Sequence, residues 1–478
     1  MSSIKKLLIT GVLYTALSKY SGIFVSILIG TILARLLTPE EFGIVALVTV
    51  FSTFFNLLTD FGIGPAIIQS HNLNEKDIQS IFTFSILLGI VFACSFFFAA
   101  PIISHFYNKP VLIGITRLLS LAILFYSLQI VPQALFQKAL LFKQLGLITF
   151  IVQFISGAIA VLLAYLGFSY YALVVQSILS GGLLLIILYI LKPIKITFCI
   201  RQKAIRKIIR FSSFQFMFNF INYFSRNTDN ILIGKFMGSS QLGYYDKSYR
   251  LMLLPVANLT HVITPALMPV LSKFQNDKQI IYSTYLKVIK VLAIIGFPLS
   301  IFLYFSANEI INILYGSQWV QSIPIFKILA LTVGIQMVLS STGSIFQALN
   351  RPDLLFYSGI LSAFFVIGGI CYGIFIGKSL EYIGYGLTIA FIINFIQVFY
   401  ILIRIALKFS YLQFLKCFFF PIVISACTGI VLFMISLLSI EQILISLCLK
   451  LIGTLLTFGI LLFFKKDYKE KILSIISQ

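Results

Sequence analysis

Apolar runs about 20 residues long recur along the whole chain, separated by short stretches that hold most of the charges. Wound as an α-helix, such a run crosses a hydrocarbon layer about 30 Å thick and satisfies its own backbone hydrogen bonds. The pattern predicts an all-α integral membrane protein with about fourteen transmembrane helices. The runs lie near residues 8–34, 43–69, 80–104, 112–136, 147–166, 170–191, 207–236, 243–271, 284–307, 323–348, 354–376, 381–405, 416–437 and 441–464.

The chain also repeats itself weakly at an offset of 200 residues. The segment "GTILARLLTPEEFG", Gly30–Gly43, aligns without a gap to "NILIGKFMGSSQLG", Asn230–Gly243, with Arg35 on Lys235. This self-similarity indicates two copies of one helical bundle, the usual plan of a transporter whose pathway runs between two lobes. Since six spans return the chain to its starting side, the two copies should share one orientation.

The longest charged connection, Lys192–Arg210, marks the expected boundary between the two copies. Gly64 and Pro65, echoed by Pro265, should bend corresponding helices in both. We expect a central cavity between an N-terminal six-helix lobe at residues 1–200 and a C-terminal six-helix lobe at 201–410, followed by two additional helices and a cytoplasmic tail at 411–478.

Composition supports a membrane protein. The chain is 60% hydrophobic and 10% charged, with a mean hydropathy of +1.05, whereas soluble domains carry about 25% charged residues. The net charge of +21 does not indicate a surface that binds nucleic acid. The positive residues collect in alternate loops, which is the distribution expected of a membrane protein. By the positive-inside rule both termini are cytoplasmic, in a bacterial inner membrane as the resemblance described below implies.

One polar stripe runs along the seventh predicted span. It is formed by Gln215, Asn219, Asn222, Arg226 and Asp229, at spacings of four, three, four and three residues. These spacings place all five on one helical face about four turns long, while the other faces are Phe, Met and Ile. Because a charge at the bilayer centre costs at least about 2.5 kcal/mol, this face should line a water-filled cavity.

The repeat offset carries the stripe back to the first span, where Lys19 lies near the middle. At that depth its ammonium group needs a carboxylate, carbonyls, water or an anionic ligand. In the eighth span Asp246 and Arg250 are four apart on one face. Two alternatives stay open for these charges: a ligand pathway, or structural pairs such as Arg226 with Asp246 and Arg250 with Asp229.

Two further acidic residues have simpler interpretations. Asp60 is either a helix-end residue in contact with water or a residue that binds a coupling ion. Glu309 is expected in or near a loop, solvated. No catalytic constellation is present, since the chain lacks HExxH, GxSxG and phosphate-loop motifs and its six cysteines show no metal spacing. We therefore expect a protein that is not an enzyme and needs no cofactor or metal.

The segments "LSKYSGIFVSILIGTILARLLTPEEFGIVALVTVFSTFFNLLTDFGIGPAIIQ" and "FSRNTDNILIGKFMGSSQLGYYDKSYRLMLLPVANLTHVITPALMPVLSKFQ" resemble polysaccharide-type flippases. These belong to the multidrug, oligosaccharidyl-lipid and polysaccharide exporter superfamily. The resemblance implies two six-helix lobes plus two helices, alternating access, and proton or sodium coupling. The implied substrate is an oligosaccharide on undecaprenyl diphosphate for O-antigen, capsule or exopolysaccharide synthesis, with a polysaccharide polymerase and other assembly proteins as partners.

The polar residues suit that substrate. Lys19, Arg226 and Arg250 would meet the diphosphate, and Gln215, Asn219 and Asn222 the sugar hydroxyls. The ion-coupling candidates are Asp60, Asp229 and Asp246.

Three other functions remain open. One is a flippase for lipid-linked peptidoglycan precursors, which shares the fourteen-helix plan. Another is a cation-coupled multidrug antiporter, which should have acidic rather than basic cavity residues. The third is a membrane scaffold or polymerase without transport.

Overall fold

The computed structural model describes residues 20–70, 73–197, 227–260 and 264–463, together with Phe216, Phe220 and Tyr223. These residues are helical or lie in turns and connections, and no strand occurs among them. Ten helices in this part of the chain are long and apolar enough to cross a membrane, or eleven if one bent pair counts as a single span. The predicted all-α, multi-span class is therefore confirmed. The figure of fourteen stays a prediction, because the start of the first span and most of the seventh fall outside the described residues.

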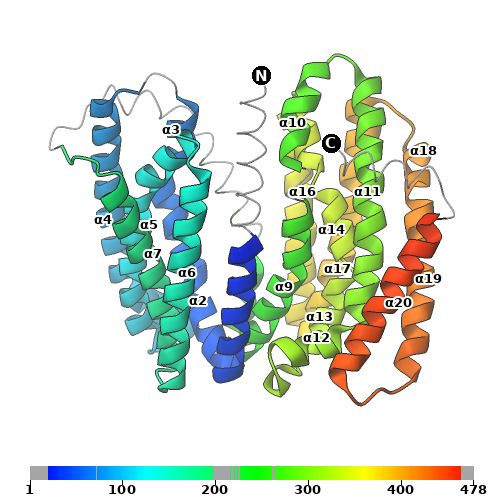
Figure 1. Cartoon of the computed structure of the whole chain (residues 1–478), viewed down its shortest axis with the longest axis horizontal. Coiled ribbons are helices and arrows are strands. Elements are labelled where there is room, and N and C mark those ends of the chain that lie inside the picture. The colour runs from blue at the N-terminus through cyan, green and yellow to red at the C-terminus, as the bar shows by residue number, and fades with distance from the viewer. Residues whose placement is uncertain are drawn as a thin grey trace. The chain divides into compact units, whose positions relative to one another are not determined.

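The chain divides into two compact units, Met1–Gly243 and Tyr244–Gln478. In the first unit, α5 is central and contacts α2, α3, α4 and α7 (Figure 1). A helix at Tyr20–Leu36 precedes them. The labelled helices of this unit are α2 (Pro39–Asp60), α3 (Ile63–Gln69), α4 (Glu75–Tyr107), α5 (Leu112–Lys138), α6 (Phe142–Tyr165) and α7 (Tyr171–Leu191).

In the second unit, α11 is central and contacts α13, α14 and α19. The helix α9 (Ser239–Thr260) begins in the first unit and continues into the second. The others are α10 (Thr264–Leu271), α11 (Lys278–Phe305), α12 (Ala307–Leu314), α13 (Ser322–Ala330), α14 (Val333–Leu339), α15 (Thr342–Ala348), α16 (Pro352–Cys371), α17 (Leu380–Phe399), α18 (Tyr411–Leu415), α19 (Phe419–Leu437) and α20 (Ile443–Phe463).

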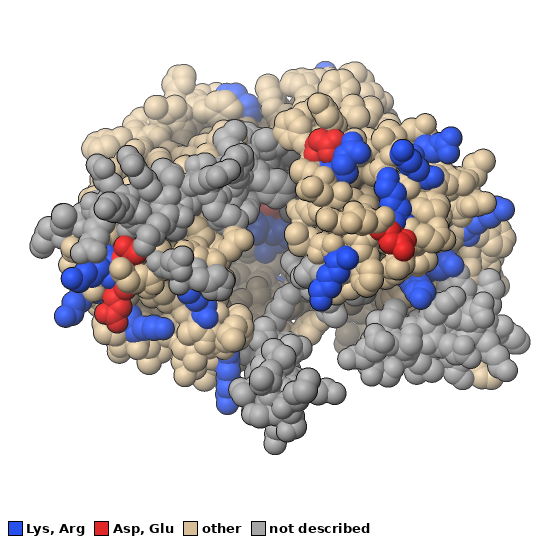
Figure 2. Space-filling model, turned by 90° about the horizontal axis from the view of Figure 1, so that it is seen from above, with Lys and Arg blue, Asp and Glu red and all other residues tan. Residues whose placement is uncertain are grey.

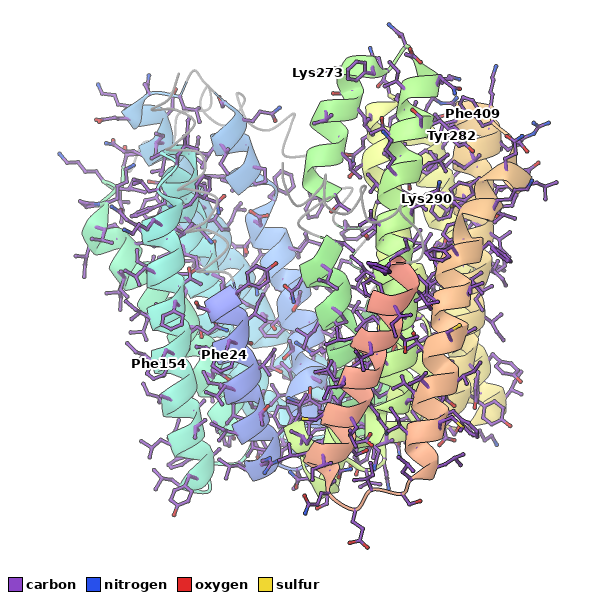
Figure 3. All side chains as sticks on the ribbon, turned by 45° about the vertical axis from the view of Figure 1, so that its right-hand side comes forward. Phe24, Phe154, Lys273, Tyr282, Lys290 and Phe409 are labelled. Atoms are coloured by element: carbon purple, nitrogen blue, oxygen red, sulfur yellow. The ribbon has the colours of Figure 1, made fainter. Side chains whose placement is uncertain are left out.

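Large apolar side chains stand exposed on these helices, as expected for surfaces that face lipid. Phe24 is 68% exposed and Phe154 is 54% exposed (Figure 3). Exposed apolar surface on this scale would drive a soluble protein to associate. Together with the ten candidate spans it shows a multi-pass membrane protein.

The sequence repeat has a counterpart in the helix boundaries. Helix α2 covers Pro39–Asp60 and α9 covers Ser239–Thr260, so both have 22 residues and are offset by 200. A short helix follows each of them, α3 from Ile63 and α10 from Thr264. Local sequence explains the start of α2: Thr38 and Glu41 form a capping box, and Pro39 occupies the first turn.

The break after α2 lies at Phe61 and Gly62, whose φ angles are 40° and 71°. The bend was expected at Gly64 and Pro65, which instead lie inside α3. Proline is tolerated there because the amides of a first helical turn need no partner within the helix. The left-handed pair therefore ends α2 directly after Asp60.

We expect Gly62→Ala to lower the free energy of unfolding by about 1 kcal/mol, because a Cβ atom opposes the left-handed backbone there. Gly64→Ala is the matched control, since the nearest atom to its added Cβ, Asp60 Oδ1, would be 3.8 Å away. Thermal unfolding of both purified variants in detergent measures the difference. Equal midpoints would show that the break does not depend on glycine.

Basic side chains gather at one end of the second unit (Figures 2 and 3). Lys278, at the start of α11, donates a hydrogen bond to the carbonyl of Ala406 at 2.8 Å. Beside them the rings of Tyr282 and Phe409 stack with their centroids 4.2 Å apart. Lys273, labelled in Figure 3, and Lys408, two residues after Ala406, lie at this same end.

Glu309 is not in contact with water, so that expectation is wrong. The residue is 6% exposed in α12, where its Oε1 accepts hydrogen bonds from Lys450 and Ser446 of α20. Lys450 is 5% exposed and also donates to the carbonyl of Phe305 at 2.8 Å. Oppositely charged groups can be buried together when each satisfies the other, which single-residue reasoning about Glu309 did not consider.

Candidate functional site

Five of the predicted site residues lie outside the described part of the chain: Lys19, Gln215, Asn219, Asn222 and Arg226. The structure does describe Asp60, Asp229, Asp246 and Arg250. Asp229 is 6% exposed, and its Oδ1 accepts a hydrogen bond from the backbone N–H of Asn230 at 2.8 Å.

Arg250 pairs with Asp246 of its own helix α9. The guanidinium Nε lies 2.9 Å from Oδ1 and 2.8 Å from Oδ2 of the carboxylate. The Asp246 side chain is 13% exposed, whereas that of Arg250 is 63% exposed. The sequence left several pairings open, and for Arg250 the structure shows this one, across a single helical turn. An exposed ion pair of this kind contributes at most about 1 kcal/mol to stability, so the contact is weak support for a purely structural role.

Lys247, next to this pair, was not singled out from the sequence. Its Nζ lies 5.3 Å from the centroid of the Tyr315 ring and 5.9 Å from that of Trp319, the single tryptophan of the chain. These are cation–π distances. Lys247 therefore brings the start of α9 into contact with the short helical turn Ser317–Trp319.

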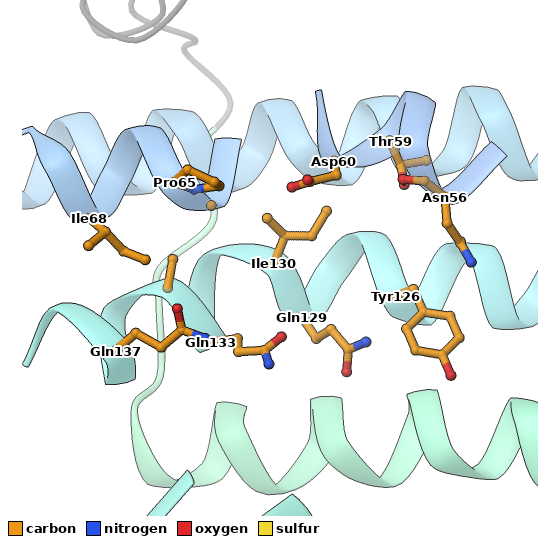
Figure 4. Close-up of a pocket in the computed structure, with 12 residues that line it drawn as sticks. Asn56, Thr59, Asp60, Pro65, Ile68, Tyr126, Gln129, Ile130, Gln133 and Gln137 are labelled. Carbon is orange, nitrogen blue, oxygen red and sulfur yellow. The ribbon is translucent and has the colours of Figure 1, made fainter. Parts of the chain in front are cut away.

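A polar pocket of about 360 Å³ lies within the first unit, around Asp60 (Figure 4). Helices α2, α3 and α5 form its walls. Its lining residues are Asn56, Thr59, Asp60, Gly64, Pro65, Ile68, Tyr126, Gln129, Ile130, Gln133, Ala134 and Gln137.

The pocket follows from two local sequence patterns. Tyr126, Gln129, Gln133 and Gln137 are spaced by three, four and four residues, so they share one face of α5 over about 16 Å. This stripe is as regular as that of the seventh span and was the signal that sequence reasoning missed. The opposite wall exists because the break at Phe61 and Gly62 ends α2 at Asp60.

Two oxygen atoms of the lining residues have no hydrogen-bond partner among the described residues. They are Oδ1 of Asn56 and Oε1 of Gln129, and both are buried. An unsatisfied buried acceptor costs about 1–3 kcal/mol.

The described residues contain no group of three or more His, Cys, Asp and Glu side chains that could hold a metal ion. Asp60 is the single carboxylate that lines the pocket, and the other polar lining groups are amides, hydroxyls and a phenol. Neither Lys nor Arg is among them.

A comparison with protein families identifies the family to which the chain belongs. The model of the family described as "Polysaccharide biosynthesis protein" matches residues 32–324, more than half of the chain. The chain belongs to this polysaccharide biosynthesis protein family. Its region of match begins in the helix before α2 and ends in α13, so it includes the pocket and the Asp246–Arg250 pair.

Curated relatives of this family member extend over most of its length. It is 26% identical over 447 residues to the teichuronic acid biosynthesis protein TuaB of Bacillus subtilis (strain 168), covering 91% of this chain and 90% of TuaB. It is also 26% identical over 434 residues to the lipopolysaccharide biosynthesis protein WzxC of Escherichia coli (strain K12), covering 87% and 86% of the two chains.

Among solved structures, the protein shares its fold with the lipid II flippase MurJ in an inward closed conformation. The TM-score is 0.73, with 15% sequence identity and coverage of 95% of this chain and 99% of the MurJ chain. At that identity the likeness concerns the fold alone.

Proposed function

We propose that this protein is a flippase that moves polysaccharide repeat units linked to undecaprenyl diphosphate across the bacterial inner membrane, for surface polysaccharide synthesis. The observation that carries the proposal is a combination of two findings. The chain belongs to a polysaccharide biosynthesis family, and nearly its full length adopts the fold of a flippase. A membrane protein that belongs to this family and has a flippase fold can serve polysaccharide synthesis by transferring lipid-linked intermediates across the membrane. That transfer requires no catalytic group.

The proposed architecture has fourteen helices, arranged as two six-helix lobes around a central cavity, plus two helices, with both termini cytoplasmic. The repeat of α2 and α9 at an offset of 200 residues supports two equivalent lobes. Transport would then proceed by alternating access, in which the polar head crosses and the polyprenyl tail stays in lipid. A polysaccharide polymerase and other assembly proteins are the expected partners, because they consume the exported unit.

The proposed diphosphate ligands are Lys19, Arg226 and Arg250, with Gln215, Asn219 and Asn222 meeting sugar hydroxyls. Arg250 has the strongest structural support. Its side chain is 63% exposed and donates to Asp246 through Nε, and a guanidinium has further N–H donors suited to phosphate oxygens. Asp246 would hold the guanidinium in place for the ligand.

Coupling to a proton or sodium gradient completes the proposal, with Asp60, Asp229 and Asp246 as candidates. A coupling carboxylate must exchange its ion with water during transport. Asp60 lines a pocket and Asp246 is partly exposed, whereas Asp229 is buried in this state. The structure thus favours the first two as exchange sites.

The alternative is a flippase for lipid-linked peptidoglycan precursors, favoured by the fold of MurJ. The two functions share chemistry and differ in the attached saccharide. Family membership favours the polysaccharide function. It also argues against a multidrug antiporter.

Deletion of the gene in its native host, with complementation, tests the function. We expect surface polysaccharide to disappear and lipid-linked repeat units to accumulate inside the cell, and wild type to restore export. Arg250→Ala should reduce export about tenfold or more, because one charge-assisted contact contributes about 1.5–3 kcal/mol. Lys19→Ala and Arg226→Ala should behave alike.

Arg351→Ala is the matched control, since Arg351 forms a comparable exposed ion pair with Asp353, with Nη2 at 2.7 Å from Oδ2. It should export normally. Unchanged surface polysaccharide after deletion contradicts the proposal. A block in cell-wall growth with intact surface polysaccharide would instead establish the peptidoglycan alternative.

A further inference from the structure

The pocket around Asp60 has a composition that the diphosphate does not explain. Its twelve lining residues include four amide side chains, one carboxylate, one threonine and one tyrosine, but neither lysine nor arginine. Lys138, one residue beyond Gln137, donates a hydrogen bond to the carbonyl of Ser70 at 2.6 Å. Because the lining offers a diphosphate no counter-charge, the anionic part of the proposed substrate binds elsewhere.

We propose that this pocket is a saccharide subsite, which binds a neutral or amino sugar of the lipid-linked unit. The inference rests on the proposed function and adds to it the ligand chemistry of a site in the first unit. It also assigns the sugar contacts to Gln129, Gln133, Gln137 and Asn56, which are distinct from the amides expected on the seventh span.

Hydrogen-bonding capacity is the first reason. A sugar hydroxyl both donates and accepts, and a carboxamide side chain does the same. Four carboxamides, those of Asn56, Gln129, Gln133 and Gln137, line the pocket and can pair with hydroxyl groups there. A polyprenyl chain offers them no hydrogen bond.

Shape is the second reason. Tyr126 and the three glutamines follow one face of α5 for about 16 Å, which matches an elongated ligand better than a single ion. The pocket volume of about 360 Å³ falls within the range of small-molecule sites, about 300–1,000 Å³. Tyr126 stands at one end of the row (Figure 4) and offers an aromatic ring to the C–H face of a sugar.

The carboxylate of Asp60 sets the specificity. It accepts hydrogen bonds from hydroxyl and ammonium groups. The subsite therefore favours sugars that present hydroxyl or amino groups at this position of the unit. This is a property of the first unit alone, independent of how the diphosphate is held.

The experiment uses the full-length protein, purified in detergent, and neutral oligosaccharides released from the host's own surface polysaccharide. Saturation-transfer NMR detects binding in the millimolar range expected for a saccharide that has lost its lipid. We expect Gln133→Ala/Gln137→Ala to weaken binding about tenfold, since each lost amide contact contributes about 1 kcal/mol. Gln153→Ala is the matched control, because Gln153 is another half-buried glutamine of the first unit that does not line the pocket.

The outcomes separate the inference from the proposed function. Saccharide binding that is absent in wild type, or equal in wild type and the double variant, overturns the subsite. If instead the double variant binds the saccharides as wild type does and alters only the effect of added sodium chloride on the protein, the pocket is a cation site alone. The assignment of a saccharide subsite is then wrong. If the double variant loses binding while gene deletion leaves surface polysaccharide intact, the subsite stands and the proposed function fails.

Discussion

A single methyl group at residue 43 should destabilise the protein by about 3 kcal/mol or more, because it has no space to occupy. A Cβ atom on Gly43 would overlap the carbonyl group of Ser239, whose carbon would be 2.5 Å away. The reciprocal holds at the repeat position: a Cβ on Gly243 would overlap the carbonyl of Pro39, with its carbon 2.9 Å away. Both obstacles are backbone, which cannot rotate aside as a side chain can.

The starts of α2 and α9 therefore approach each other through their glycines, within the first unit. Gly43→Ala and Gly243→Ala should each force these two helix ends apart. The measurements are the yield of folded protein in the membrane and the thermal midpoint of the purified variant in detergent. Gly30→Ala is the matched control, since no atom lies within 4 Å of its added Cβ. A Gly43→Ala midpoint equal to that of Gly30→Ala would refute this close approach.

The repeat could be recognised in the sequence because the residues that mark it are glycines at close backbone contacts. The sequence aligns Gly43 with Gly243 at the offset of 200 residues, and both are sites of close contact. The boundaries of α2 and α9 obey the same offset. The position of the bend was predicted less well, because Phe61 adopts a positive φ that no residue preference indicates.

The apolar run at 243–271 was predicted as a span, and helix α9 covers most of it. Among the described helices α9 is not one of the candidate spans, because Asp246, Lys247 and Arg250 lie within it. Charged residues lower the mean hydropathy of a helix, so its apolar character alone understates a span of this kind.

The pocket and the buried ion pair were missed for a different reason. The glutamines of α5 were visible at helical spacing, but their opposite wall depends on the unexpected end of α2. Glu309 and Lys450 are 141 residues apart. A partner at that distance cannot be inferred from local pattern, so the tertiary contact decides whether each charge is solvated or buried.

The Glu309–Lys450 pair leads to the second large prediction. Lys450→Met should destabilise the second unit by about 3–5 kcal/mol, because it leaves a buried carboxylate without its counter-ion. The side chains are 8% and 6% exposed, and Oε2 of Glu309 already has no partner among the described residues. Ser446, whose hydroxyl donates to Oε1 at 2.7 Å, cannot replace the lost charge.

The double variant Glu309→Gln/Lys450→Met should recover most of the lost stability. Removing both charges also removes the cost of burying them, so a neutral pair of similar size is often tolerated. Thermal midpoints of wild type, both single variants and the double variant form a cycle that isolates the coupling between the two residues. Additive effects of the single substitutions would mean that the charges do not stabilise each other.

At acid pH the difference in thermal midpoint between wild type and Lys450→Met should become smaller. Glu309 lies in α12, beyond the end of the candidate span Lys278–Phe305. Burial acts to raise the pKa of Glu309, but hydrogen bonds from Lys450 and Ser446 outweigh it, so the net shift is downward. A carboxyl group with a lowered pKa stabilises the folded state above its ordinary pKa, and this contribution disappears as the pH falls through the lowered value. The Lys450→Met variant lacks that contribution from the outset, so its deficit in thermal midpoint should be largest near neutral pH and smaller in acid. A deficit that stays constant across this range would assign the destabilisation to lost packing of the lysine stem along α20 rather than to the buried charge.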